Sequence, residues 1–162
     1  MNEKKPLRKS LKKEAKKGNK AKYESYREAF SRIKAANESG FFLEAIAIQE
    51  ALITDRLKSH LGHLEKLPDK YGFAKLIKKW SNLNESHANV KITISLPLFV
   101  NQWRLMRNIA IHEFISKQDL DLFLESAKSA AKTGAVITRA VCDWHKVEVR
   151  KAKLNNKTPK NL

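Results

Sequence analysis

The chain has a single cysteine, Cys142, among its 162 residues. An intramolecular disulfide and any cysteine-based zinc site are therefore excluded, and the composition fits a reducing, cytoplasmic setting. No apolar run approaches the roughly 18 residues that a membrane-spanning helix needs, so we expect no contact with a membrane. The basic N-terminus has no apolar stretch behind its charges, so we expect no secretory signal.

Acidic residues are scarce: 17 Asp and Glu stand against 33 Lys and Arg, which gives a formal net charge of +16. This excess indicates a polyanionic partner, most often a nucleic acid. Residues 1–22 carry a net charge of +8 and residues 146–162 a net charge of +5, so the charge is concentrated at the two ends. We predict a basic N-terminal arm over residues 1–22, either flexible or a frayed helix. A helical domain over 23–155 and a basic tail over 156–162 follow.

The basic ends are predicted to contact the phosphates of RNA. The residues assigned to this contact are Lys12, Lys13, Lys16, Lys17, Arg150 and Lys151. The alternative is that the two ends only keep the protein in solution, because a large net charge also prevents association.

Glycine and proline are also few, with five and four residues, and strand-like alternation is rare. The chain is therefore predicted to be all-α, an antiparallel bundle of four to five helices. Helical periodicity predicts helices over residues 23–37, 41–67, 73–80 and 97–115, and from 120 into the basic tail. Residues 82–95 are predicted to form an extended loop, and Gly134 is predicted to kink the last helix.

The segment Arg107-Asn108-Ile109-Ala110-Ile111-His112 places polar groups in an otherwise apolar helix. An arginine can hold phosphate oxygens by a bidentate hydrogen bond, and an imidazole titrates near neutrality. Together they supply what metal-free cleavage of a phosphodiester needs. In a helix the two side chains point about 140° apart, so they can line one edge of a groove but cannot form a tight pair. Asn108 and His112 share a face, which Arg104 extends.

The motif and the helical layout resemble the HEPN superfamily, whose members are small all-helical domains marked by an arginine, four to six intervening residues and a histidine. A polar residue commonly follows the arginine, as Asn108 does here. Two other pairs, Arg56 with His63 and Arg139 with His145, fit the loose spacing, but an apolar residue follows each of their arginines. Only the six-residue motif is specific, and the rest of the resemblance is architectural.

The resemblance implies a metal-independent endoribonuclease without a cofactor, of the kind found in toxin–antitoxin and phage-defence systems. Arg107 and His112 would be catalytic, supported by Asn108 and Arg104. The 2′-hydroxyl of RNA would attack its own phosphate, leaving a 2′,3′-cyclic phosphate and a 5′-hydroxyl. Family members bring two motifs together across a two-fold axis, so a homodimer is implied, and an antitoxin protein is a candidate partner.

Other functions and roles remain open at this point. The main alternative is an inert HEPN-like module that binds nucleic acid or a protein, and a third is an unrelated basic helical protein that coats nucleic acid. In a structural role, Arg107 would pair with Asp121 or Glu125 on the following helix. Glu44 and Glu50 are either supporting residues of the site or ordinary solvated or salt-bridged positions.

The remaining histidines and the tryptophans are assigned structural places. His60 and His63 lie three residues apart without a third ligand nearby, so no metal site is predicted. His87 and His145 are expected at the surface. The three tryptophans are expected to be core or dimer anchors, and Trp103 is the best candidate for the dimer surface.

Overall fold

The computed structural model describes residues 5–64, 67, 71–86, 95–116 and 120–155, and within them it contains five helices and no strand. The helices are α1 (Lys5–Glu38), α2 (Phe42–Leu64), α3 (Phe73–Ser86), α4 (Ser95–Ser116) and α5 (Leu120–Asn155). The predicted all-α class is confirmed. Of these helices, none is both long enough and apolar enough to cross a membrane.

α1 begins at Lys5, so it includes the helix predicted over residues 23–37 and most of the basic arm, for which a frayed helix is one of the two predicted forms. Helical backbone therefore runs through most of the basic arm. Lysine, the commonest residue of this stretch, favours helix even where no apolar stripe marks one. Pro6 lies in the first turn, where its missing N–H removes no helical hydrogen bond. The apolar residues at helical spacing begin near Tyr23, and the helix predicted over residues 23–37 was based on them.

The other helix ends lie closer to their predicted positions. The second helix ends at Leu64 rather than near residue 67, and α4 begins at Ser95. The third helix continues to Ser86, so the predicted loop over 82–95 is partly helical. The remainder of that loop, residues 87–94, lies outside the described residues.

Gly40 makes the turn between α1 and α2. Its φ of 80° lies in the left-handed region, which glycine adopts without steric penalty. The Phe41 N–H donates to the Ala36 carbonyl at 2.8 Å, and the Ser39 N–H donates to the Ala35 carbonyl at 2.9 Å. The first of these bonds closes the end of the helix in the Schellman pattern. The short turn allows α2 to fold back against α1.

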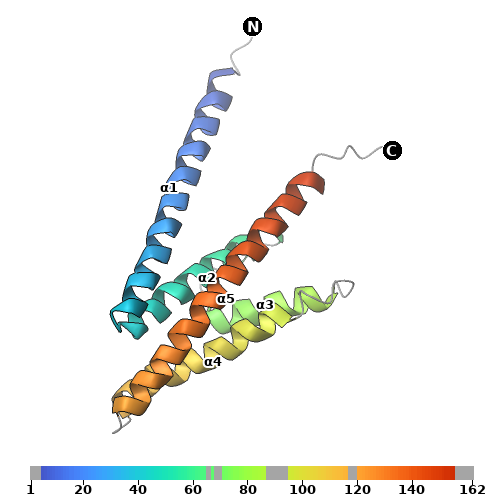
Figure 1. The fold of residues 1–162 in the computed structure, drawn as a ribbon. Coiled ribbons are helices and arrows are strands. Elements are labelled where there is room, and N and C mark those ends of the chain that lie inside the picture. The colour runs from blue at the N-terminus through green and yellow to red at the C-terminus, as the bar shows by residue number, and fades with distance from the viewer. Residues whose placement is uncertain (1–4, 65–66, 68–70, 87–94, 117–119, 156–162) are drawn as a thin grey trace.

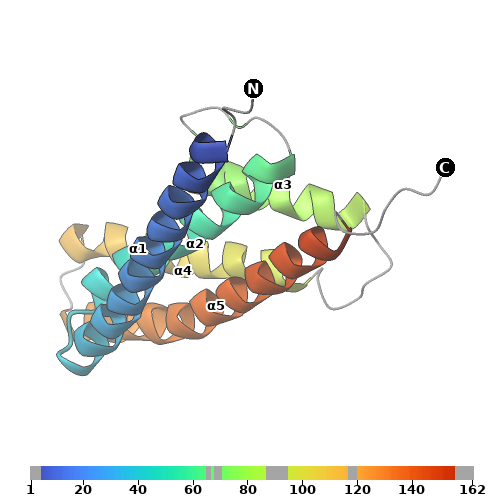
Figure 2. The same cartoon turned by 90° about the horizontal axis from the view of Figure 1, so that it is seen from above.

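The centre of the bundle is formed by α2 and α5, and the other helices pack around them (Figures 1 and 2). α4 packs along α5, α3 packs on α4 and α2, and α1 packs mainly on α2. Trp80 and Trp103 are wholly buried in a core that is otherwise mostly aliphatic. The N-terminal half of α1 and the C-terminal half of α5 diverge as they leave this body (Figure 1).

At the crossing of α2, α4 and α5 the packing centres on Gly134, which is buried. A Cβ atom added here would overlap the side-chain amide of Gln49 and lie 2.6 Å from Nε1 of Trp103. These two side chains donate to α5 carbonyls, Gln49 Nε2 to Ala131 at 2.8 Å and Trp103 Nε1 to Ala130 at 2.9 Å. α5 is a single helix through this position. Glycine is required here because the three helices pack closely, and the sequence pattern did not indicate this packing.

Candidate functional site

The Arg107–His112 motif lies on α4. Its arginine faces α2, and its histidine faces solvent. Nη2 of Arg107 forms an ion pair with the Glu50 carboxylate on α2. Nη1 of the same guanidinium donates to Asn108 Oδ1 at 2.6 Å. The His112 side chain is exposed. The arginine and the histidine therefore lie on different faces of the helix, as the helical spacing predicts.

The ion pair between Arg107 and Glu50 is largely shielded from solvent. The two side chains are only 19% and 25% exposed. Nε of Arg107 is buried and has no hydrogen-bond partner among the described residues. The guanidinium is thus held from two sides, and its charge is balanced by one carboxylate. An incoming phosphate would have to use the exposed edge of the guanidinium or replace Glu50.

The partner of Arg107 differs from the one that a structural role predicts. The bridge to Asp121 or Glu125 is wrong, because α4 presents this side chain to α2 rather than to the start of α5. Glu125 instead pairs with Lys128 on its own helix, at 3.0 Å. Of the two acidic candidates on α2, Glu50 is the salt-bridged one.

The supporting residues of the motif are divided between two local groups. Asn108 is half-buried and bonded to the guanidinium of Arg107. Arg104, one turn earlier, donates from Nε to Asn101 Oδ1 at 3.0 Å. The structure therefore brings the arginine, the amide and the α2 carboxylate together, while the histidine and the second arginine stand outside this group.

The outer face of α4 is apolar. Leu98, Leu105 and Ile109 recur at helical spacing and are 55%, 48% and 51% exposed. His112 continues the same stripe by one more turn. Trp103 is wholly buried, so its predicted place on the dimer surface is wrong. The helix turns this indole inward, where its N–H bonds an α5 carbonyl.

The predicted RNA-binding residues lie on the two helices that leave the body of the bundle. Lys12, Lys13, Lys16 and Lys17 fall on the first half of α1, and their side chains lie outside the part that the structure describes. Arg150 is exposed near the end of α5. Lys151 pairs with Glu148 at 2.8 Å.

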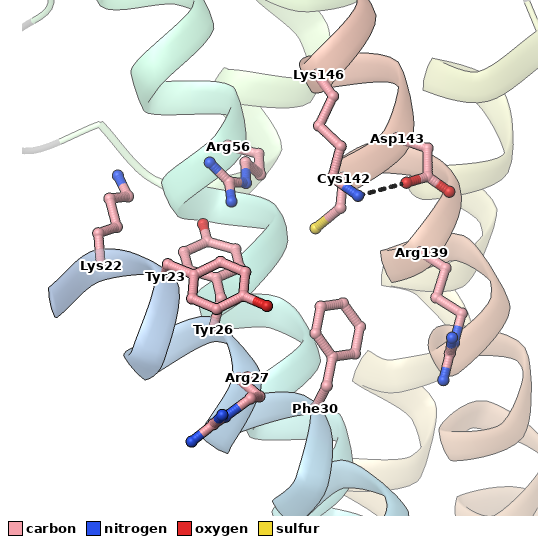
Figure 3. A pocket seen from close by; sticks show the side chains of 10 residues that line it. All are labelled: Lys22, Tyr23, Tyr26, Arg27, Phe30, Arg56, Arg139, Cys142, Asp143 and Lys146. Atoms are coloured by element: carbon pink, nitrogen blue, oxygen red, sulfur yellow. Dashed lines mark hydrogen bonds and ion pairs between the residues drawn. The ribbon is translucent and has the colours of Figure 1, made fainter. Parts of the chain in front are cut away.

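A cavity of about 580 Å³ opens between α1, α2 and α5, and we call it the α1–α5 cleft (Figure 3). It is lined by residues 22–30 of α1, by Arg56 of α2 and by residues 139–146 of α5. Figure 3 shows cationic side chains on both sides of it and aromatic side chains on the α1 side. The cleft was not predictable from local sequence patterns, because its walls come from opposite ends of the chain. The available signal was the run of Tyr23, Tyr26 and Phe30 among basic residues.

One wall of the cleft is fixed by a hydrogen-bonded group. The Tyr26 hydroxyl donates to the Asp55 carboxylate, which also accepts from Lys22 at 2.9 Å. The Arg56 guanidinium lies 3.8 Å from the centre of the Tyr26 ring. Burial and the bond to Asp55 raise the pKa of Tyr26, so the phenol stays neutral. Burial favours the neutral form of Asp55, but the bonds from Tyr26 and Lys22 outweigh it and lower the pKa of this carboxyl.

His145 is buried, with 6% of its surface exposed, so its predicted surface position is wrong. α5 turns this side chain toward the basic residues of α2 rather than toward solvent. Burial, together with the positive charges of Arg56 and His60, lowers the pKa of His145 to about 4. Its Nε2 atom has no hydrogen-bond partner among the described residues. The folded state therefore holds this imidazole neutral.

This burial predicts a loss of stability in mild acid. The unfolded chain protonates His145 near its ordinary pKa of 6.5, while the folded chain resists protonation until about pH 4. The contribution is fully present above pH 6.5 and is lost as the pH falls toward 4, on the order of 3 kcal/mol in all. Urea unfolding of the wild type and of His145→Gln at several pH values between 7 and 4 measures it. Parallel pH dependences for the two proteins would contradict it.

Two groups of residues thus stand out: the Arg107–Asn108–Glu50 group beside the exposed His112, and the α1–α5 cleft. Compared with protein-family models, with curated proteins and with solved structures, the chain gives no significant match to any of them.

Proposed function

We propose that this protein is a metal-independent endoribonuclease of the HEPN type, with an active site assembled from α4 of two copies. One arrangement carries the proposal. Arg107 is held in place by Glu50 and Asn108, and His112 is exposed beside an apolar stripe of the same helix. A positioned cation and an accessible imidazole are the two groups that phosphodiester cleavage without a metal requires.

In this mechanism RNA supplies its own nucleophile. The 2′-hydroxyl lies next to its phosphate, so the reaction is intramolecular and gains from proximity. One His112 takes the proton from the 2′-oxygen, and His112 of the second copy gives a proton to the departing 5′-oxygen. Arg107 stabilises the negative charge that builds up on the phosphate. The products carry a 2′,3′-cyclic phosphate and a 5′-hydroxyl.

The proposal requires a second copy, because one arginine and one histidine on different faces of α4 cannot supply both the base and the acid. The apolar stripe of Leu98, Leu105 and Ile109 ends at His112, so a two-fold contact along it would bring the two histidines toward each other. Burying such a stripe removes apolar surface from water, which is the main driving force for association.

We therefore expect the wild type to be a dimer at micromolar concentration and Leu105→Glu/Ile109→Glu to be a monomer without activity. Each acid would meet its own copy across the two-fold axis, so desolvation and like-charge repulsion oppose association. Light scattering gives the mass, and Val136→Glu is the matched control, because Val136 is 69% exposed on α5. A monomeric wild type with full activity would exclude the composite site.

The charge of the chain fits RNA as the substrate, and the basic ends would hold it. Metal-free RNases of this size and fold type act in toxin–antitoxin and phage-defence systems, so we place this protein among such effectors. An antitoxin protein would be a further partner. The affinity for RNA would depend steeply on salt, because each phosphate contact releases counterions.

A catalytically inert module that binds nucleic acid is the second candidate, and a specific observation favours it. The charge of Arg107 is already balanced by Glu50 in a shielded pair. An arginine committed to a carboxylate in this way also links α2 to α4 as a purely structural group. The two candidates are separated by RNA cleavage in EDTA, comparing the wild type with His112→Ala.

A further inference from the structure

The position of the α1–α5 cleft suits an extended anionic chain. It lies where α1 and α5 begin to diverge, and beyond it the two helices extend on the same side of the body (Figure 1). Those extensions carry the two basic ends of the chain, with net charges of +8 over residues 1–22 and +5 over residues 146–162. An anionic chain attracted by these ends is therefore led into the cleft between them.

The charge inside the cleft selects an anion. Five cations line it, Lys22, Arg27, Arg56, Arg139 and Lys146, against the single carboxylate of Asp143. Asp55 adds a second carboxylate behind the wall, but it is occupied by Tyr26 and Lys22. Lys146 is shared with Asp143 at 2.8 Å. Arg27 and Arg139 form no ion pair within the described part of the chain, so both guanidiniums are available to phosphates.

The aromatic side chains separate this cleft from a simple basic patch. Tyr26 is part of the wall, covered by Arg56 on its ring and bound at its hydroxyl. Tyr23, one turn of helix away from Arg27, is 69% exposed although it lines the cleft. Phe30 is half-buried and points across the cleft toward α5, with Arg139 at 5.6 Å from its ring centre (Figure 3). An exposed ring between guanidiniums is the surface on which an unpaired base stacks.

We propose that the α1–α5 cleft binds single-stranded RNA, stacking bases on Tyr23 and Phe30 and holding phosphates with Arg27, Arg139 and Lys146. Paired bases would be turned inward and could not reach these rings, so a duplex is disfavoured. The cleft volume of about 580 Å³ is that of a small-molecule site, which suits one short stretch of a longer strand. The choice of RNA over other single strands rests on the proposed function. The stacking and phosphate contacts are argued from the cleft residues alone.

The test measures binding without cleavage, so its outcome is independent of the RNase proposal. The probe is a fluorescein-labelled 2′-O-methyl RNA 12-mer, which has no free 2′-hydroxyl to act as nucleophile. Fluorescence anisotropy of the full chain is expected to show about a tenfold loss of affinity in Tyr23→Leu. Arg27→Gln/Arg139→Gln should weaken binding and lower the slope of log affinity against log salt by about one for each lost phosphate contact.

Matched controls remove a cation or an aromatic ring that lies outside the cleft. Arg32→Gln removes a cation from the same helix, and Phe41→Leu removes an exposed ring elsewhere, so both should bind as the wild type does. An abasic strand of the same length should bind more weakly than the 12-mer and should not respond to Tyr23→Leu. A single-stranded DNA 12-mer is expected to compete for the cleft, and duplex RNA is not.

The results that would overturn the proposal are specific. Wild-type affinity in the Tyr23→Leu/Phe30→Leu protein, with unchanged helical content, would show that no base stacks here. Equal binding of the abasic strand, or equal competition by polyglutamate, would reduce the cleft to a general anion site. If the 12-mer responds as expected but no RNA is cleaved, the binding cleft stands and the RNase proposal fails.

Discussion

His112→Ala and Arg107→Ala should each reduce RNA cleavage in EDTA by at least about a thousandfold, while the helical content stays unchanged. General acid–base catalysis contributes roughly 10²- to 10⁴-fold, and each subunit pair would lose both its base and its acid at once. Loss of the guanidinium removes the charge that stabilises the transition state. The measurement is cleavage of a labelled RNA, with detection of the 2′,3′-cyclic phosphate end.

The arginine variant needs its own control, because Arg107 also balances Glu50. Arg107→Ala alone leaves a half-buried carboxylate without its cation, which costs about 1–3 kcal/mol. The double variant Arg107→Ala/Glu50→Ala removes both charges, so it should recover stability but not activity. Arg107→Lys keeps the charge and should rescue activity poorly, because lysine cannot make the bidentate phosphate contact.

The pH dependence and the phenotype give two further readouts of the same site. If two copies of His112 act as base and acid, the rate should follow a bell-shaped pH profile. Expression of the wild type should slow growth, and expression of His112→Ala should not. A folded His112→Ala protein that cleaves RNA at the wild-type rate would end the RNase proposal and leave the binding module.

The helical class and most helix ends were accessible from the sequence, because they depend on local periodicity and on a few glycines and prolines. The helical form of the basic arm was predictable only as one of two alternatives, because residues 5–22 show little apolar periodicity. Gly134 looked like a helix defect in the sequence. Its packing role depends on Gln49 and Trp103, which lie far away along the chain.

Within the candidate site, only the relative positions of residues on the same helix were predictable from the sequence. The placing of Arg107 and His112 on different faces of α4 follows from helical geometry. The choice of Glu50 over Glu125 as the arginine's partner depends on which helices pack together, and no periodicity contains that information. The burial of His145 and the joining of α1 with α5 around the cleft have the same long-range origin.

The same substitution at two glycines should change stability in opposite directions. Gly134→Ala should lower the free energy of unfolding by about 3 kcal/mol or more, because a methyl group would displace Gln49 and Trp103. Both side chains would then lose their bonds to α5 carbonyls inside the core, where an unpaired polar group costs about 1–3 kcal/mol. Urea unfolding followed by circular dichroism measures the change.

Gly62→Ala is the matched control, since a Cβ atom there would meet nothing within 4 Å and the residue is exposed on α2. Alanine restricts the unfolded chain more than glycine does, so this variant should gain up to about 1 kcal/mol. The contrast isolates packing from helix propensity, which favours alanine at both positions. If Gly134→Ala were as stable as the wild type, α2, α4 and α5 could not cross as closely as the structure places them.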